Sequence, residues 1–104
     1  MINTFDDNNW ENIKKEEISV IQFSASWCSP CKELTPVLEK LSKNFEGKAT
    51  FYYADVEEGG LNKGSELGIR GVPSTIIFKR GVEVDRLVGY PGEAKVAEWL
   101  SKNI

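Results

Sequence analysis

The chain has 104 residues, of which 40% are hydrophobic and 28% are charged, a composition typical of one globular domain without long disordered stretches. The net charge of -3 comes from interspersed acidic and basic residues, so the sequence offers no basic surface for a nucleic acid. It contains no histidine, which excludes imidazole catalysis and any zinc site that needs imidazole, and no run of about 18 apolar residues that would span a membrane.

The first part of the chain predicts two strands with a helix between them. Apolar and polar residues alternate over residues 2–5, which favours a short strand. Asp6 or Asp7 is a suitable N-cap for a helix that runs to about residue 15. Residues 18–25 are rich in β-branched and aromatic side chains, and they predict a strand that is buried on both faces in a parallel sheet.

The clearest amphipathic pattern follows the second predicted strand. Apolar residues recur at three- and four-residue spacing from Leu34 to Phe45, which predicts a helix that ends at Gly47. Pro36 lacks the N–H that would bond to the Lys32 carbonyl, so we expect it to bend this helix.

The second half of the chain predicts three more strands and two more helices. The third strand comes after the long helix, so it should lie parallel to the second strand through a right-handed crossover. The last two strands should form an antiparallel hairpin. The strands are expected at residues 49–56, at 74–78 and from Val82 to Leu87, and the helices at 61–67 and from Glu93 on. The whole pattern predicts a single α/β domain over residues 1–104.

Both cysteines lie in the segment Ser26-Trp27-Cys28-Ser29-Pro30-Cys31-Lys32, between a buried strand and the long helix. Free N–H groups and the positive end of the helix dipole favour the thiolate of Cys28, which is the reactive form. The three-residue spacing places Cys31 on the same helical face, within reach of a bond to Cys28. The pattern predicts thiol–disulfide exchange, in which Cys28 attacks a substrate disulfide and Cys31, the more buried sulfur, resolves the mixed disulfide.

Three other interpretations of the cysteine pair compete with exchange chemistry. A structural disulfide over so short a loop would restrict the unfolded chain very little. A closed metal site needs four ligands where the chain offers two cysteines, so only a metal that bridges a dimer would fit, and we expect none. Two inert buried cysteines are the third alternative, and the position between strand and helix weighs against it.

The chain resembles the thioredoxin family over nearly its whole length. The resemblance rests on the segment Trp27-Cys28-Ser29-Pro30-Cys31-Lys32, on the bent helix after it and on Gly68-Ile69-Arg70-Gly71-Val72-Pro73-Ser74, with further matches at Phe78-Lys79-Arg80-Gly81 and Gly89. It implies the thioredoxin fold: a mixed five-stranded sheet in the order 1-3-2-4-5, flanked by about four helices, with the active site at the carboxyl end of the second strand.

The resemblance also implies a substrate-binding role for the segment around Val72 and Pro73. It implies that the Val72–Pro73 peptide bond is cis and packs against the cysteines, and that the Val72 backbone pairs with a substrate peptide in the manner of a strand. A trans proline at the start of a strand is the alternative.

An apolar rim around Cys28 is the second feature that the resemblance implies. Its members would be Trp27, Pro30, Gly71 and Gly89. Trp27 also fits a packed aromatic that anchors the loop, and the two glycines also fit simple turn residues.

Three neighbours are expected to shape the site. Pro30 is tolerated in the first helical turn because the early N–H groups have no acceptor there. Lys32 adds a positive charge, which contributes only modestly if it is exposed. Ser29 replaces the glycine that is most common between the cysteines of the family, so the reduction potential can differ.

The chain departs from the family pattern beneath the cysteines. Gln22 stands where the family usually carries a buried aspartate, six residues before Cys28, and Phe51 stands where a lysine often accompanies that acid. A glutamine cannot accept the proton that Cys31 must lose. We therefore hypothesise that Gln22 leaves exchange intact but slows resolution and alters its pH dependence.

The expected function is reduction of protein disulfides by a thioredoxin-type electron carrier that maintains cell redox homeostasis. We expect a thioredoxin reductase and disulfide-containing proteins as partners, no bound cofactor, and a monomer. We expect a cytoplasmic location because the first residues lack a signal sequence, although a mature chain that has lost its signal would look the same. The alternatives are a protein-binding module with dispensable cysteines, which the substitutions at Gln22 and Phe51 favour, and a disulfide oxidant or isomerase.

Overall fold

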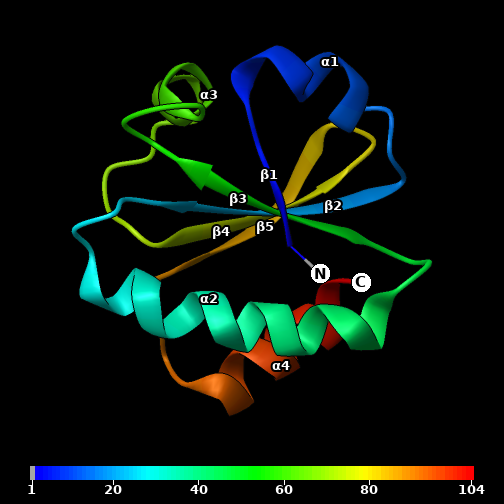
Figure 1. Cartoon of the computed structure of the whole chain (residues 1–104). Helices are drawn as coiled ribbons and strands as arrows, with labels where there is room; N and C mark the ends of the chain where they lie inside the picture. The colour runs from blue at the N-terminus through cyan, green and yellow to red at the C-terminus, as the bar shows by residue number, and fades with distance from the viewer. Residues whose placement is uncertain (1) are drawn as a thin grey trace.

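A mixed five-stranded sheet forms the centre of the structure (Figure 1). The computed structural model describes residues 2–104, and in it the strands lie in the order β1-β3-β2-β4-β5, as predicted. β1 and β2 pair with β3 in parallel, whereas β4 pairs antiparallel with both β2 and β5. The strands are β1 (Ile2–Thr4), β2 (Ile18–Ser24), β3 (Thr50–Asp55), β4 (Ser74–Lys79) and β5 (Val82–Val88).

Helices cover both faces of the sheet. In Figure 1, α1 and α3 lie on one face, and α2 and α4 lie on the other. The α-helices are α1 (Trp10–Ile13), α2 (Ser29–Ser42), α3 (Leu61–Glu66) and α4 (Glu93–Asn103), and two short 3-10 helices are η1 (Asp7–Asn9) and η2 (Lys43–Phe45). None of the helices within residues 2–104 has the length and apolar character needed to cross a membrane.

The first helical segment is shorter than predicted. Asp6 is its N-cap, as expected, and accepts a hydrogen bond from the Asn8 N–H at 2.9 Å. The segment starts as the 3-10 helix η1, however, and α1 ends at Ile13 instead of continuing to about residue 15. The neighbouring Asp7 does not cap this segment; its carboxylate accepts hydrogen bonds from two N–H groups at the start of α3, a contact that the local sequence does not reveal.

The long helix α2 also ends earlier than predicted. It ends at Ser42 and tightens into η2, so Gly47, which has a φ of +82°, comes after the 3-10 turn and does not directly close the α-helix. Pro36 lies inside α2, and the helix continues through it for another six residues to Ser42.

Two large apolar clusters, one on each face of the sheet, form most of the core, and a smaller third cluster surrounds the cysteines. Successive residues of β2 alternate between the two large clusters: Val20 packs into the cluster with α2 and α4, whereas Ile21 and Phe23 pack into the other. All of β2 after its first residue is buried, which confirms the prediction of a strand covered on both faces. Gln22 lies among these buried residues, so its polar side chain must find partners inside the protein.

Candidate functional site

Cys28 and Cys31 form a disulfide at the carboxyl end of β2. Cys28 is the N-cap of α2, and its Sγ accepts a hydrogen bond from the Cys31 N–H at 3.2 Å. In the reduced protein this backbone donor and the helix dipole stabilise a negative charge on Cys28 Sγ. The local sequence produces this arrangement because a buried strand ends immediately before the first turn of a helix.

Burial distinguishes the two cysteines only slightly. Cys28 is 4% exposed and Cys31 is 2% exposed, and both belong to a small apolar cluster with Ala25, against which Val56 and Val72 pack. The order agrees with the prediction that Cys31 is the more buried, but the difference is too small to decide which sulfur attacks. The hydrogen bond from the Cys31 N–H to Cys28 Sγ is the stronger distinction between them.

Trp27 stands at the surface beside the cysteine pair. Its side chain is 66% exposed, and its indole N–H donates a hydrogen bond to Glu57 Oε1 at 3.1 Å. Trp27 therefore does not pack as a buried anchor of the loop; it offers a large apolar surface next to Cys28. The other predicted neighbours Ser29, Pro30 and Lys32 are exposed as well.

The segment before β4 meets the cysteines from the other side. The Val72–Pro73 peptide bond is cis, as expected, and the Val72 carbonyl oxygen lies 3.6 Å from Cys28 Sγ. The Gly89 N–H donates a hydrogen bond to the Pro73 carbonyl at 2.8 Å, and the φ of +86° at Gly89 suits a glycine. The structure thus brings Val72, Pro73 and Gly89 together near Cys28, and leaves Gly71 exposed at the edge of this group.

A buried polar network lies beneath the resolving cysteine. Gln22 is 0% exposed, and its amide nitrogen donates to Ser24 Oγ at 2.8 Å and to Thr35 Oγ1 at 3.0 Å. The Thr35 hydroxyl in turn donates to the Cys31 carbonyl at 2.9 Å, and Gln22 Nε2 lies 3.4 Å from the same carbonyl oxygen. Gln22 therefore takes the position beneath the cysteines that its place in the sequence predicts.

Sequence reasoning missed two members of this network, Ser24 and Thr35. Their spacing places them on the same faces as Gln22 and Cys31, but it does not reveal their contacts. Ser24 comes two residues after Gln22 and so lies on the same face of β2, and Thr35 comes four residues after Cys31, one helical turn along α2. Phe51, which pairs with Val20 in the sheet, is buried in the apolar cluster beneath α2 and supplies no charge.

Buried titratable groups lie away from the cysteine pair. Within residues 2–104 the buried side chains of this kind, apart from the cysteines, are Lys63 and Tyr52. Lys63 pairs with Glu66 at 3.0 Å and lies over the Trp10 ring. Burial, together with a hydrogen bond to Glu16, raises the pKa of Tyr52 well above its ordinary value. The network beneath Cys31 is therefore uncharged.

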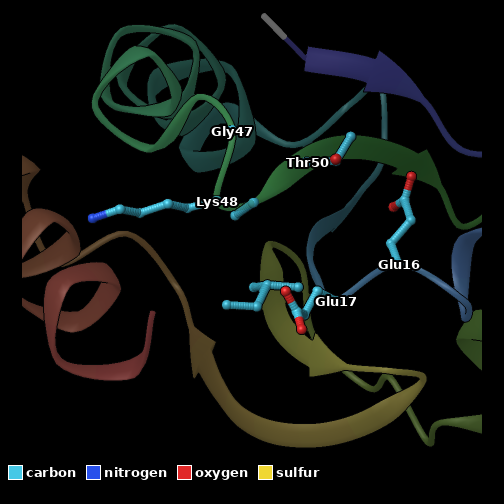
Figure 2. Close-up of a pocket in the computed structure, with 7 residues that line it drawn as sticks. Glu16, Glu17, Gly47, Lys48 and Thr50 are labelled. Carbon is cyan, nitrogen blue, oxygen red and sulfur yellow. The ribbon is translucent and has the colours of Figure 1, made fainter.

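A separate cavity of about 310 Å³ opens at the other end of the sheet, where β2 and β3 begin (Figure 2). Two carboxylates line it, but both have partners: Glu16 accepts a hydrogen bond from Tyr52, and Glu17 pairs with Arg80 at 3.1 Å. Figure 2 shows the Lys48 side chain extending away from both carboxylates. Residues 2–104 also contain no group of three His, Cys, Asp or Glu side chains suited to a metal ion.

Comparisons with known proteins agree with this geometry. The thioredoxin family model matches residues 1–102. A thioredoxin of Staphylococcus haemolyticus is 35% identical over 98 residues, which cover 94% of this chain and 93% of the relative. The crystal structure of the Malassezia sympodialis thioredoxin Mala s 13 is 30% identical, with a TM-score of 0.89 over 99% of this chain and 90% of that one. The similarity therefore extends over the whole fold.

Proposed function

The chain belongs to the thioredoxin family and is a thiol–disulfide oxidoreductase, and we propose that it reduces protein disulfides with Cys28 as the nucleophile and Cys31 as the resolving thiol. The observation that carries this assignment is the hydrogen bond from the Cys31 N–H to Cys28 Sγ at 3.2 Å. It favours the thiolate at Cys28, which is the form that attacks disulfides.

The reaction proceeds in two exchanges. The Cys28 thiolate attacks one sulfur of the substrate disulfide, so a Cys28–substrate bond forms, the substrate bond breaks, and the departing thiolate takes a proton from solvent. Cys31 then loses its proton, to solvent or to the departing substrate sulfur, and attacks Cys28 Sγ, so the intramolecular disulfide forms and the bond from Cys28 to the substrate breaks. Two electrons pass to the substrate, which becomes a dithiol, while the cysteine pair is oxidised.

The proposed substrate surface surrounds Cys28. An extended substrate segment would pair with the Val72 backbone, whose carbonyl lies 3.6 Å from Cys28 Sγ and whose N–H finds no acceptor within residues 2–104. The rim of this surface is Trp27, Pro30, Gly71 and Gly89. The exposure of Trp27 and Pro30, with Gly71 exposed beside Val72, supports this assignment.

The oxidised pair must return to the dithiol before the next turnover. A reductase of the thioredoxin reductase class would supply the two electrons, and disulfide-containing proteins would be the substrates. Residues 1–104 would act as one domain and as a monomer without a bound cofactor. A reducing compartment such as the cytoplasm suits this direction of electron flow.

Insulin reduction tests the proposed roles of the two cysteines. Wild type is expected to accelerate the reduction of insulin disulfides by dithiothreitol, and Cys28→Ser is expected to lose this activity. Cys31→Ser should instead accumulate covalent complexes with substrates at Cys28, because the second exchange is blocked. An inactive wild type would favour a binding module, and complexes that form only in Cys28→Ser would reverse the roles of the cysteines.

A further inference from the structure

We propose that Thr35 and Gln22 are positioning residues for the second exchange, because together they hold the backbone of Cys31 so that its sulfur can reach Cys28. The proposal rests on the function proposed above, in which Cys31 is the resolving thiol. It assigns to a partly buried hydroxyl and a buried amide a role in one step of the reaction only.

The contacts link the sheet to the helix through the side chains of Gln22 and Thr35, and the Thr35 hydroxyl also lies within donor distance of Gln22 Oε1, at 3.3 Å. The Gln22 amide donates to the Thr35 hydroxyl at 3.0 Å, and this hydroxyl donates to the Cys31 carbonyl at 2.9 Å. The Ser24 hydroxyl accepts the other strong bond of the amide, at 2.8 Å, and so fixes its orientation. Because hydrogen bonds in a chain polarise one another, the link from β2 to the first turn of α2 is stronger than its separate parts.

The first turn of α2 needs this support because of Pro36. A proline at this position has no N–H for the Lys32 carbonyl, and its ring crowds that carbonyl, so the regular hydrogen-bond ladder is interrupted one residue beyond Cys31. A threonine hydroxyl bonded to the carbonyl four residues earlier is typical of bent helices. Thr35 and Gln22 therefore tie down the part of the helix that the proline weakens and that carries the resolving sulfur.

The link does not depend on pH, because none of its members titrates. Gln22, Ser24 and Thr35 are neutral at every pH at which the protein is folded. A defect in the link should therefore lower the rate of resolution by the same factor across the pH range. A group that accepted the proton of Cys31 would instead change the shape of the pH profile.

A chromogenic disulfide separates the two exchanges. Reduced protein is mixed with dithiobis(nitrobenzoate); attack on the reagent releases one nitrothiobenzoate in a second-order phase, and resolution releases the next in a first-order phase. Thr35→Val keeps the shape of the side chain and removes the hydroxyl, so we expect the first-order phase to slow about fivefold, the equivalent of one hydrogen bond, and the second-order phase to stay unchanged. Thr35→Ser keeps the hydroxyl and should restore the rate to within about twofold of wild type.

Thr75→Val is the matched control for the loss of a buried hydroxyl. Thr75 lies opposite Gln22 in the pairing of β2 with β4, and its Oγ1 is buried without a hydrogen-bond partner within residues 2–104. This variant should keep wild-type kinetics in both phases. Circular dichroism checks that each variant is folded, and Thr35→Ala provides the same comparison if Thr35→Val does not fold.

Several outcomes would overturn the proposal. A positioning role would be contradicted if Thr35→Val left the first-order phase unchanged or slowed both phases equally. It would also be contradicted if Thr75→Val showed the same loss, or if the loss in Thr35→Val varied with pH. Failure of the proposed function is distinct from these outcomes, because it would appear in wild type itself as the absence of the second phase. The expected pattern is a defect that is confined to resolution, constant from about pH 6 to about pH 9 and rescued by serine.

Discussion

Replacing Gln22 with aspartate would place a titratable group in the neutral network beneath the cysteines. Gln22 is fully buried and donates two short hydrogen bonds, to Ser24 at 2.8 Å and to Thr35 at 3.0 Å. An ionised aspartate can donate neither, and each lost bond costs about 1 kcal/mol. The side chain also loses one methylene, which adds about 1 kcal/mol. We therefore expect Gln22→Asp to be less stable than wild type by about 3 kcal/mol before the burial of charge is counted.

The buried charge adds a cost that depends on pH. Burial raises the pKa of a carboxyl above its unfolded value of about 3.9, so the folded variant prefers the protonated form. A raised pKa in the folded state means that the charge costs nothing below about pH 4. Above that pH the free energy of unfolding of the variant falls by about 1.4 kcal/mol for each pH unit, until the carboxyl ionises in the folded state and the fall levels off.

Urea unfolding of the oxidised proteins measures this cost, with Gln22→Asn as the matched control. Asn and Asp have the same length, but Asn keeps an amide donor, so only the part of the stability difference between the two variants that changes with pH isolates the charge. The free energy of unfolding of the Asp variant should fall progressively below that of the Asn variant between about pH 4 and about pH 7. Parallel stability curves for the two variants would show that the carboxyl carries no pH-dependent cost of burial. The same two variants test the resolution step in the chromogenic disulfide assay. The rate of the first-order phase in the Asp variant should depend on pH differently from that of wild type. An identical pH profile would contradict the hypothesis that Gln22 governs the pH dependence of resolution.

Two further predictions concern parts of the fold outside the site. Asp7→Ala removes a carboxylate that accepts hydrogen bonds from two N–H groups at the start of α3. Urea unfolding should therefore show that the free energy of unfolding falls by about 1–2 kcal/mol, while the kinetics of disulfide exchange stay unchanged. A variant as stable as wild type would contradict this capping role. Because burial raises the pKa of Tyr52, the contribution of Tyr52 to stability should be constant below about pH 10 and fall as the pH rises further. Tyr52→Phe should therefore flatten the loss of stability above about pH 10, and tyrosinate absorbance from Tyr52 before unfolding would contradict the prediction.

The arrangement of strands follows from patterns that are local in the sequence. The apolar run of β2 predicts a buried central strand, and the long amphipathic repeat after it predicts α2 and hence the parallel pairing of β2 with β3. The limits of α1 could not be predicted in the same way. Asp7 suits an N-cap as well as Asp6 does, and only the packing of α3 against η1 decides that Asp7 caps a helix more than 50 residues away.

The residues of the site also fall into those that the sequence reveals and those that it does not. The cysteine pair is visible in the sequence through its spacing, and Gln22 because it stands where the family usually carries an aspartate. Thr35 is not, because a threonine in an amphipathic helix is common and gains a role only where α2 packs on β2. The functional weight of such a residue comes from tertiary contacts, which no local pattern encodes.

A neutral network beneath Cys31 shifts the control of resolution toward the substrate. No buried carboxylate lies there in residues 2–104 to take the proton of Cys31, so the proton passes to solvent or to the departing substrate sulfur. The rate of the second exchange then depends on the ionisation of Cys31 and on the leaving thiol, and thiols of low pKa leave faster. We therefore expect this protein to discriminate among substrates by the acidity of the second sulfur released. Geometry, held constant across pH by Gln22 and Thr35, sets the rate that all substrates share.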